Sequence, residues 1–399
     1  MHQFNFSLEK TDHRTDARAG IVYTPHGAIE TPVFMPVGTQ GTVKALSPAE
    51  LVECSAKIVL GNTYHLHLRP GDELIRDAGG LHKFASWGGA LLTDSGGYQV
   101  FSLRDISKIT DDGVEFRSHI DGSLHFFSPE RVMEIEHNLG ADIIMAFDEC
   151  PPGKADAAHV AGAVERSLRW AARCAEAHAR LSLHFGFPQA LFGIVQGGTS
   201  EVLRQRCAAE LVAMDLPGYA IGGLAVGEDI AATYRVAGFT ASLLPQEKPR
   251  YLMGVGTPVD ILEGIERGID MFDCVLPTRN ARNGSAFTHG GKVNIRNACH
   301  TRDFDHPLDS LCGCMTCRNF SRAYLRHLYM AGEILALRLL TLHNVHFYLE
   351  LVRSARVQII SGDFARWKEA MVDSLLKKNE AAETGSDAAT PPEIPGVNR

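Results

Sequence analysis

The residues best suited to chemistry lie around Asp273. This aspartate ends an apolar stretch at 268–272 and is followed by a proline turn and two arginines, Arg279 and Arg282. A carboxylate can act as a nucleophile or a base, and neighbouring guanidinium groups bind phosphates. The pattern indicates chemistry on a substrate that carries phosphate groups, although a strand end followed by surface arginines would have the same sequence.

Two further aspartates follow apolar runs. Asp94 precedes the paired glycines Gly96 and Gly97, in a turn that can bring backbone amides close to a ligand. Asp148 follows the run at 142–147. If the three carboxylates share a site, their repulsion raises the pKa of at least one of them. One could then be a nucleophile and another a proton carrier, as in retaining glycosidases.

Neutral polar groups end other apolar runs. Gln196 offers a side-chain amide and Gly222-Gly223 offer backbone groups, while Tyr98 and Met253 could stack on the two faces of a flat ring. An amide, a carboxylate and backbone groups together can read the edge of a purine. Met253 could equally belong to the core, and Gln196 could simply cap a turn.

Three cysteines lie within six residues, at Cys312, Cys314 and Cys317. With His343 they would form a closed tetrahedral zinc site, which is structural because no ligand position is left for water. Zinc binding would then stabilise the surrounding segment directly. The alternatives for the fourth ligand are His346, Cys299 and His300.

The composition limits the class of protein. The chain has 399 residues, of which 45% are hydrophobic and 22% charged, so it can bury a large core in one or two domains. A net charge of -8 excludes a general polyanion binder, and any contact with nucleic acid must use local basic residues. The absence of a long apolar run and of a signal sequence predicts a cytoplasmic protein with no membrane span and reduced cysteines.

Short apolar runs alternate with helical stretches. Eight runs are expected to be strands: 33–35, 57–60, 90–93, 142–147, 191–195, 219–221, 251–252 and 269–272. Long helices are expected at about 155–180, 199–214, 229–243 and 257–266. The predicted fold class is therefore α/β, a (β/α)8 barrel whose active site lies where the strands end. An open doubly wound sheet is the alternative, but no phosphate-binding glycine fingerprint is visible.

Several segments lie outside this alternation. Residues 19–24 and 28–34 are expected to form an N-terminal hairpin, and 109–127 a hairpin insertion. The expected division is a catalytic barrel at 1–284, a zinc-binding subdomain at 285–350, barrel-closing helices at 351–377 and a charged, proline-rich disordered tail at 378–399.

Seven motifs resemble, in chain order, those of the tRNA-guanine transglycosylases, the base-exchange enzymes of the queuosine pathway. They are DSGGYQVFSL at 94–103, FDEC at 147–150, IVQGG at 194–198, GGLAVGE at 222–228, MGVGTP at 253–258, FDCVLPTRNARNG at 272–284 and the CxCxxC motif with its later histidine. The resemblance covers roughly residues 5 to 375 and is far more specific than any single motif.

The resemblance implies a role for each group. Asp273 would attack C1′ of the wobble guanosine of a tRNA and form a covalent intermediate, with Asp94 as general acid and base. The implied base-binding residues are Ser95, Gly96, Gly97, Tyr98, Asp148, Cys150, Gln196, Gly223 and Met253. The implied contacts with the anticodon loop are Gly254, Val255, Gly256, Thr257, Pro258, Val259, Asp260, Thr278, Arg279, Asn280, Ala281 and Arg282.

The resemblance also implies the incoming base and the partners. Cys150 and Val226 match the bacterial type, which takes 7-aminomethyl-7-deazaguanine, whereas the eukaryotic type takes the bulkier queuine. One structural Zn²⁺ per subunit is implied, with no redox or nucleotide cofactor. A homodimer is also implied, in which Tyr324 and His327 match interface positions.

Two other functions remain open. A glycoside hydrolase on a barrel would share the carboxylates, but it would not explain Arg279, Arg282 or the zinc unit, and none of the three tryptophans lies in a strand-end motif. A non-catalytic tRNA-binding paralogue would be expected to lose the aspartates at 94, 148 and 273, which this chain keeps.

Overall fold

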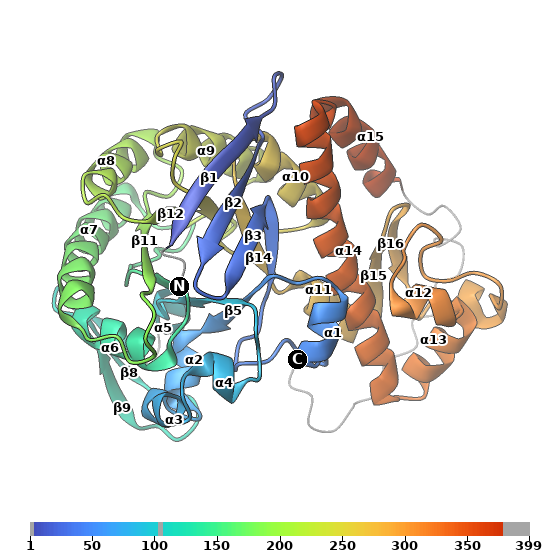
Figure 1. Cartoon of the computed structure of the whole chain (residues 1–399), viewed down its shortest axis with the longest axis horizontal. Helices are drawn as coiled ribbons and strands as arrows, with labels where there is room; N and C mark the ends of the chain where they lie inside the picture. Colours follow the sequence, from blue (N-terminus) through green and yellow to red (C-terminus); the bar gives the residue numbers. More distant parts are fainter. Residues whose placement is uncertain (1–3, 103–106, 378–399) are drawn as a thin grey trace.

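A barrel and a smaller C-terminal unit make up the protein (Figure 1). The computed structural model describes residues 4–102 and 107–377. The tail expected at 378–399 lies outside the described residues.

Eight parallel strands form the barrel. Their order around the sheet is β4 (Val33–Pro36), β14 (Met271–Cys274), β13 (Arg250–Leu252), β12 (Gly218–Ile221), β11 (Ala190–Val195), β10 (Ile143–Met145), β6 (Ala90–Asp94) and β5 (Ile58–Asn62). A parallel bridge between Val37 and Leu60 joins the two ends of the sheet. The prediction of a (β/α)8 barrel is therefore confirmed. The eight strands begin and end within a few residues of the expected runs, since each run is apolar on both faces and is buried on both.

Helices cover the outside of the barrel, and α7 to α10 follow its rim in Figure 1. The helices of this part of the chain are α1 (Pro48–Glu53), α2 (Thr63–Leu68), α3 (Asp72–Asp77), α4 (Leu81–Phe84), α5 (Gly97–Ser102), α6 (Pro129–Leu139), α7 (Ala157–Arg180), α8 (Glu201–Val212), α9 (Ile230–Ser242), α10 (Pro258–Glu266) and α11 (Leu276–Arg282). Side-chain caps explain where several of these helices begin. Ser47 and Glu50 form the capping box that the sequence predicts for α1, and Thr257 and Asp260 form another for α10.

An antiparallel sheet closes the N-terminal end of the barrel. It contains β1 (Asn5–Thr11), β2 (Arg18–Thr24) and β3 (Gly27–Thr31), and it lies in front of the barrel strands in Figure 1. Phe6, Val22 and Ile29 share one apolar cluster with side chains inside the barrel. The second strand expected at 28–34 is divided at Pro32, because β3 belongs to this sheet and β4 to the barrel. β1 was not expected, because its residues are mostly polar and exposed.

A buried carboxylate links this sheet to the barrel. Asp142 lies 2.7 Å from Nδ1 of His26, in the β2–β3 turn, and 3.2 Å from Nε2 of His82 on α4. The two imidazole rings stack with centroids 3.6 Å apart. Burial alone would raise the pKa of Asp142, but the hydrogen bond from His26 and the proximity of His82 lower it to about 2. The group is a hydrogen-bonded clamp.

The insertion between β6 and α6 has three strands instead of the two expected. β7 (Ser107–Ile109), β8 (Val114–Arg117) and β9 (Leu124–Phe127) form an antiparallel sheet. Val114, Phe116 and Phe127 bury their side chains in the main core. The insertion is thereby fixed beside the C-terminal ends of the barrel strands.

The C-terminal unit lies to one side of the barrel. It contains β15 (Ser285–Thr288), β16 (Gly291–Asn294), η2 (Ala298–Arg302), α12 (Met315–Asn319) and α13 (Arg322–Met330), followed by α14 (Ile334–Ser361) and α15 (Phe364–Leu376). Figure 1 shows α14 standing between this unit and the barrel. The sequence-based boundary at 350 falls inside α14, because one continuous helix carries His343 in the unit and Arg356 against the carbonyls of Gly20 and Thr31.

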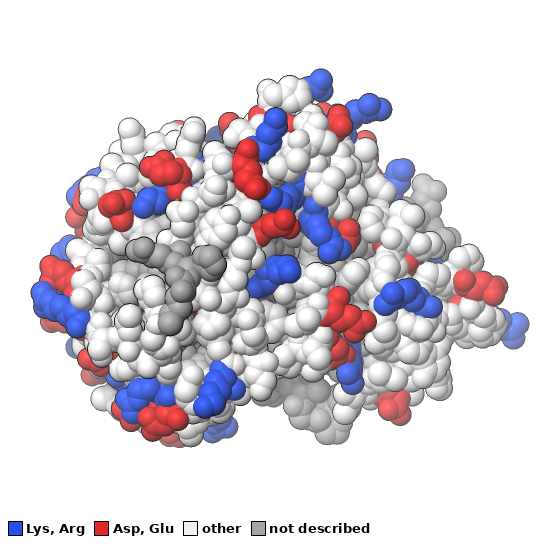
Figure 2. Space-filling model, viewed as in Figure 1, with Lys and Arg blue, Asp and Glu red and all other residues white. Residues whose placement is uncertain are grey.

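The face that carries the N-terminal sheet has acidic and basic side chains interspersed (Figure 2). No helix among residues 4–102 and 107–377 is long and apolar enough to cross a membrane.

Candidate active site and metal centre

A cavity of about 590 Å³ lies at the C-terminal ends of the barrel strands. The structure brings together in its lining all the catalytic and base-binding residues expected from the sequence: Asp94, Ser95, Gly96, Gly97, Tyr98, Asp148, Cys150, Gln196, Gly223, Met253 and Asp273. They come from the ends of six strands, β6 and β10 to β14, and the loops that follow them. Their convergence follows from the parallel barrel, in which every strand ends at the same face.

Asp273 presents one carboxylate oxygen to the cavity. Its Oδ1 accepts a hydrogen bond from the hydroxyl of Tyr251 at 2.6 Å and another from the backbone N–H of Gly254 at 2.7 Å. No hydrogen bond from a residue in the described ranges reaches Oδ2. Burial raises the pKa of Asp273, and the two donors offset part of that effect. The carboxylate is thus held by one oxygen while the other remains available.

Asp94 lies at the end of β6 and is held by donors on several sides. The side-chain amides of Asn62 and Gln99 donate to Oδ2, and the backbone N–H groups of Thr63 and Gly96 donate to Oδ1 at 3.1 and 3.2 Å. Burial nevertheless raises the pKa of Asp94 to about 6. A carboxyl group with a pKa near neutrality can both take and give a proton during turnover.

Asp148 and Gln196 form a hydrogen-bonded pair on the cavity wall. Nε2 of Gln196 donates to Oδ2 of Asp148 at 2.6 Å, and the Ser95 hydroxyl donates to Oδ1 at 3.2 Å. Burial raises the pKa of Asp148 to about 6. Oε1 of Gln196 is buried and has no hydrogen-bond partner within the part of the chain that the structure describes. A buried, unsatisfied acceptor is costly, and this oxygen lies against the backbone at Gly223.

The two expected stacking residues differ in exposure. The Tyr98 side chain is 59% exposed at the cavity edge, whereas Met253 is half-buried and packs against the apolar cluster inside the barrel. Met253 therefore belongs to both the lining and the periphery of the core. An exposed aromatic ring beside a cavity can cover the face of a planar ligand.

The residues expected to hold RNA fall into two groups. Gly254, Val255, Gly256, Asp260 and Arg279 line the cavity. Outside the lining lie Thr257, Pro258, Val259, Thr278, Asn280, Ala281 and Arg282. The side chains of Pro258, Thr278 and Ala281 are buried.

Arg279 supplies positive charge to the cavity lining, and Arg282 lies three residues later on α11, outside the lining. Neither guanidinium is within ion-pair distance of an acidic side chain in the described ranges. Burial lowers the pKa of Arg282, and the neighbouring charge of Arg279 lowers it further. Two cations without an acidic partner are suited to bind an anionic ligand.

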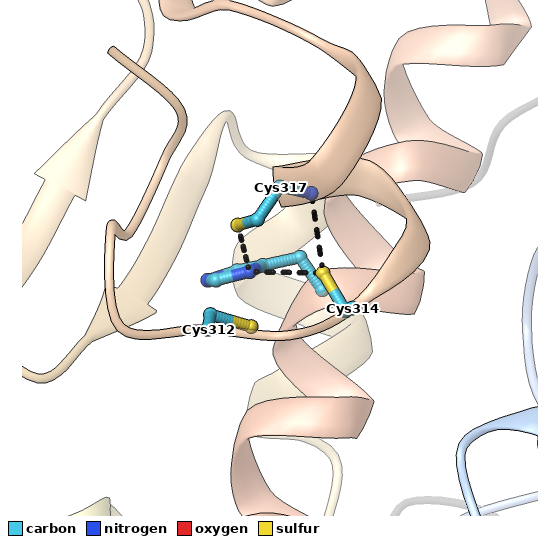
Figure 3. Close-up of side chains that lie close together, drawn as sticks. Cys312, Cys314 and Cys317 are labelled. Carbon is cyan, nitrogen blue, oxygen red and sulfur yellow. Dashed lines mark hydrogen bonds between the residues drawn. The ribbon is translucent and has the colours of Figure 1, made fainter.

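Three cysteines and one histidine converge in the C-terminal unit. Figure 3 shows Cys312, Cys314 and Cys317 in one loop and the start of α12. Nδ1 of His343 lies 3.6 Å from Sγ of Cys314 and 3.3 Å from Sγ of Cys317. Tetrahedral zinc with ordinary Zn–S and Zn–N bonds would separate such ligands by about 3.5 Å.

The surroundings of the cluster also suit a metal. Nε2 of His343 donates to the carbonyl of Phe287 at 2.7 Å, which leaves the lone pair of Nδ1 facing the thiols. The four ligand atoms lie within 4.8 Å of one another. The fourth member of the cluster is therefore His343, and the alternatives from the sequence, His346, Cys299 and His300, are outside it.

The sequence did not single out three residues of the cavity. Asn62 and Gln99 hold Asp94, and Tyr251 holds Asp273. Asn62 could have been found, since it ends β5 as Asp94 ends β6. Tyr251 could not, because it lies inside an apolar strand and its partner is 22 positions away.

Comparison with known proteins agrees with this geometry. A family model described as queuine tRNA-ribosyltransferase matches residues 12–377. A protein of that name from Caldanaerobacter subterraneus subsp. tengcongensis is 58% identical over 380 residues, covering 95% of this chain and 100% of the relative. Proteins of the same name from Thermoanaerobacter pseudethanolicus and Desulforamulus reducens are 58% identical over 380 residues and 56% identical over 362 residues. They cover 95% and 91% of this chain, and 100% and 96% of their own lengths.

Proposed function

The chain belongs to the queuine tRNA-ribosyltransferase family, and we propose that it exchanges the wobble guanine of target tRNAs for 7-aminomethyl-7-deazaguanine through a covalent Asp273 intermediate. Membership of this family makes it a tRNA-guanine transglycosylase, a pentosyltransferase of queuosine synthesis. The incoming base, the covalent step and the residue roles are our proposal.

The proposal of a covalent step rests on the unequal hydrogen bonding of the two carboxylate oxygens of Asp273. Two donors hold Oδ1, so Oδ2 keeps a fixed direction and faces the cavity. In the first step Oδ2 attacks C1′ of the wobble nucleotide while the bond from C1′ to N9 breaks. The guanine leaves with the bonding electrons and takes a proton from Asp94.

The second step reverses the first with a different base. Asp94, now a carboxylate, accepts the N9 proton of the incoming base. The resulting nitrogen attacks C1′, and the ester bond to Asp273 breaks, which releases the carboxylate. Two displacements at C1′ leave its configuration unchanged, as in the double displacement of retaining glycosidases.

Base recognition is assigned to Asp148, Gln196 and Gly223. A guanine-like edge offers N–H donors to the Asp148 carboxylate and a carbonyl oxygen to the amide and backbone donors opposite. Ser95, Gly96, Gly97 and Cys150 would complete the pocket, with Tyr98 and Met253 on the two faces of the ring. The lining of the cavity supports this arrangement.

The cysteine–histidine cluster is assigned to one structural Zn²⁺. The ion would join the CxCxxC loop to α14 and so fix the C-terminal unit against the barrel. It lies in a different part of the molecule from the cavity, and the proposed base exchange does not involve it.

The tRNA is assigned to the mouth of the cavity. Arg279 and Arg282 would contact the phosphates of the anticodon loop, beside the segment at 254–260. A homodimer is proposed, with Tyr324 and His327 at its interface. A tRNA substrate implies the cytoplasm as the place of action.

The test is incorporation of labelled guanine into a tRNA with guanine at the wobble position. A matched tRNA with adenine at that position is the control. A transglycosylase incorporates label only into the first tRNA. A hydrolase would release guanine without incorporation, and a non-catalytic tRNA-binding protein would do neither, so either result would refute the proposal.

A further inference from the structure

Arg204, on α8, is a fully buried cation behind the cavity. Its side chain is 0% exposed. Its guanidinium donates to three backbone carbonyls, those of Gly198 at 2.8 Å, Val195 at 3.1 Å and Gly222 at 2.8 Å. Within the described ranges no carboxylate forms an ion pair with it. Burial lowers the pKa of Arg204 to about 10, so it is still charged at neutral pH.

A buried charge without a counter-charge is unusual. Buried ions are normally paired with an opposite charge. The free energy needed to remove an ion from water is far larger than the free energy gained from hydrogen bonds to neutral groups. Arg206 on the same helix has the ordinary arrangement, since it is exposed and pairs with Glu165 and Glu210. The position of Arg204 therefore calls for an explanation beyond packing.

Two of the three carbonyls belong to residues that directly precede groups we assign to the base. Val195 ends β11 and precedes Gln196, and Gly222 follows β12 and precedes Gly223. A Cβ atom at Gly223 would lie only 2.3 Å from Oε1 of Gln196, so the amide and this backbone are in direct contact. Gly223 has φ +64°, a conformation that suits glycine. Arg204 thus links the end of β11 to the end of β12 through hydrogen bonds to their carbonyls.

The contact with Gly222 fixes the direction of the next N–H. In a trans peptide the C=O and the N–H point to opposite sides. Because the Gly222 carbonyl points to Arg204, the N–H of Gly223 points away from it, toward the sulfur of Cys150 in the cavity lining. A cation on the carbonyl also polarises the peptide and makes its N–H a stronger donor.

We propose that Arg204 is a positioning residue that aims and polarises the Gly222–Gly223 peptide, so that the Gly223 N–H binds the carbonyl oxygen of the base. When the bond from C1′ to N9 breaks, negative charge develops on the leaving base and spreads to that oxygen. A donor backed by a buried cation stabilises this charge more than the neutral substrate. The inference depends on the proposed function, because it assigns a role in base exchange.

The test compares Arg204→Lys with Arg206→Lys as the matched control. Lysine keeps the charge, but it lacks the planar guanidinium group that can donate to three carbonyls at once. We expect the KM for guanine to rise about tenfold or more in Arg204→Lys, with kcat lower and the KM for tRNA unchanged. Arg206→Lys should leave all three as in wild type.

A base without the carbonyl oxygen separates positioning from general damage. 2-Aminopurine lacks the 6-oxygen of guanine and also its N1–H, which would meet Asp148 equally in every variant. The change in the ratio of the two inhibition constants between wild type and Arg204→Lys therefore measures the contact with the 6-oxygen. We expect wild type and Arg206→Lys to prefer guanine by about tenfold or more, and Arg204→Lys to lose part of that preference. A purely structural defect would weaken both bases equally and leave the ratio unchanged.

The possible results distinguish a failure of the proposed function from a failure of the proposed role of Arg204. If wild type does not incorporate guanine, the proposed function fails. If it does so but shows no preference over 2-aminopurine, or if folded Arg204→Lys keeps the wild-type ratio, only the role of Arg204 is refuted. Arg204→Gln, which retains an amide donor for the Gly222 carbonyl without the charge, is the second variant should the lysine variant not fold.

Discussion

The hydroxyl of Tyr251 donates a hydrogen bond of 2.6 Å to Oδ1 of Asp273 from inside the barrel wall. Tyr251 is on β13 and Asp273 on the adjacent β14, so the backbone of the barrel fixes the pair. Burial and the nearby carboxylate keep the pKa of Tyr251 well above its ordinary value. The phenol therefore remains a donor throughout the pH range of activity, and Asp273 can present only Oδ2 to a substrate.

Asp273→Asn should abolish base exchange, by roughly 10³-fold or more, and leave tRNA binding nearly unchanged. The carboxamide has the same shape but is a far weaker nucleophile. Wild type incubated with tRNA should give a covalent protein–RNA band on a denaturing gel, and the variant should give none. Tyr251→Phe is the matched variant, because it should still form the band but more slowly. A band of wild-type intensity from Asp273→Asn would exclude Asp273 as the nucleophile.

The exchange rate should fall on acidification through about pH 6. Burial raises the pKa values of Asp94 and Asp148 to about 6. In the proposed mechanism the free enzyme needs Asp148 as a carboxylate to accept from the base, so Asp148 gives the acid limb of kcat/KM. The first step also needs Asp94 protonated to donate to N9, so Asp94 gives an alkaline limb, and the two carboxyl groups influence each other. Asp148→Asn should lower kcat/KM at pH 8 and flatten the acid limb, whereas an unaltered limb would contradict this assignment.

The same shifts act on stability in the opposite direction. The folded-state pKa values of Asp94 and Asp148 lie above the value of about 3.9 for an unfolded aspartate. Between pH 4 and 6 the folded state then binds more protons, so this contribution to the free energy of unfolding rises as the pH falls from about 6 to about 4. Denaturant titrations across this range should show a smaller rise for Asp148→Asn than for wild type.

The sequence could predict the barrel and the approximate position of its site, because both follow from local patterns. Eight apolar runs predict eight strands, and in a parallel barrel the polar residues after them must converge, as Asp94, Asp148 and Asp273 do. β1 was missed because a mostly exposed edge strand is stabilised by its pairing with β2 and has no apolar pattern of its own.

Buried polar residues were harder to predict. Tyr251 lies in an apolar strand, and nothing in the neighbouring sequence indicates that it binds Asp273. Arg204 lies in the charged helical segment RQRCAAE, where an arginine is expected to face water. Its burial depends on carbonyls from two different strand ends, which only the folded chain brings together. The residue pattern within a single helix or strand does not reveal tertiary contacts of this kind.

The C-terminal unit should bind one equivalent of zinc per chain. Cys317→Ala removes one of four ligands, and we expect it to lose most of the metal, to unfold residues 285–350 and to weaken dimerisation before it alters the barrel. Metal analysis and limited proteolysis would measure both effects. Cys299→Ala is the control, since Cys299 is an exposed cysteine of the same unit outside the cluster. Full zinc content and unchanged stability in Cys317→Ala would contradict the assignment.

Arg279→Ala should raise the KM for tRNA about tenfold and leave the KM for the free base unchanged, because Arg279 lines the cavity and we propose that its guanidinium contacts a phosphate of the tRNA. Arg282→Ala should act in the same direction. The slope of log Kd against log salt concentration should also decrease, since fewer counterions are released on binding. Arg180→Ala is the control, as Arg180 is exposed on α7 and pairs with Glu176. Wild-type tRNA kinetics across a salt series in both variants would place the phosphate contacts elsewhere.

The incoming base should be 7-aminomethyl-7-deazaguanine in preference to queuine, because of the wall formed by Cys150 and Val226. Both residues line the cavity. The chain after Cys150 packs against Val226, since a Cβ atom at Gly153 would lie 2.8 Å from the Val226 carbonyl oxygen. A short aminomethyl cation fits beside such carbonyls, whereas the cyclopentenediol of queuine needs the volume of the two side chains.

Val226→Gly should therefore admit queuine, with a gain of about 10- to 200-fold in its kcat/KM, the range typical of steric selection in an apolar pocket. Ala225→Gly is the matched control, because it adds backbone freedom at the neighbouring residue, which already has φ +57°, without removing the wall. Competition of each base against labelled guanine incorporation measures the preference. If wild type incorporated queuine as well as 7-aminomethyl-7-deazaguanine, the bacterial type of base selection would be excluded while base exchange itself would stand. If Ala225→Gly gained queuine as strongly as Val226→Gly, flexibility of the loop and not the volume of the Val226 side chain would set the specificity.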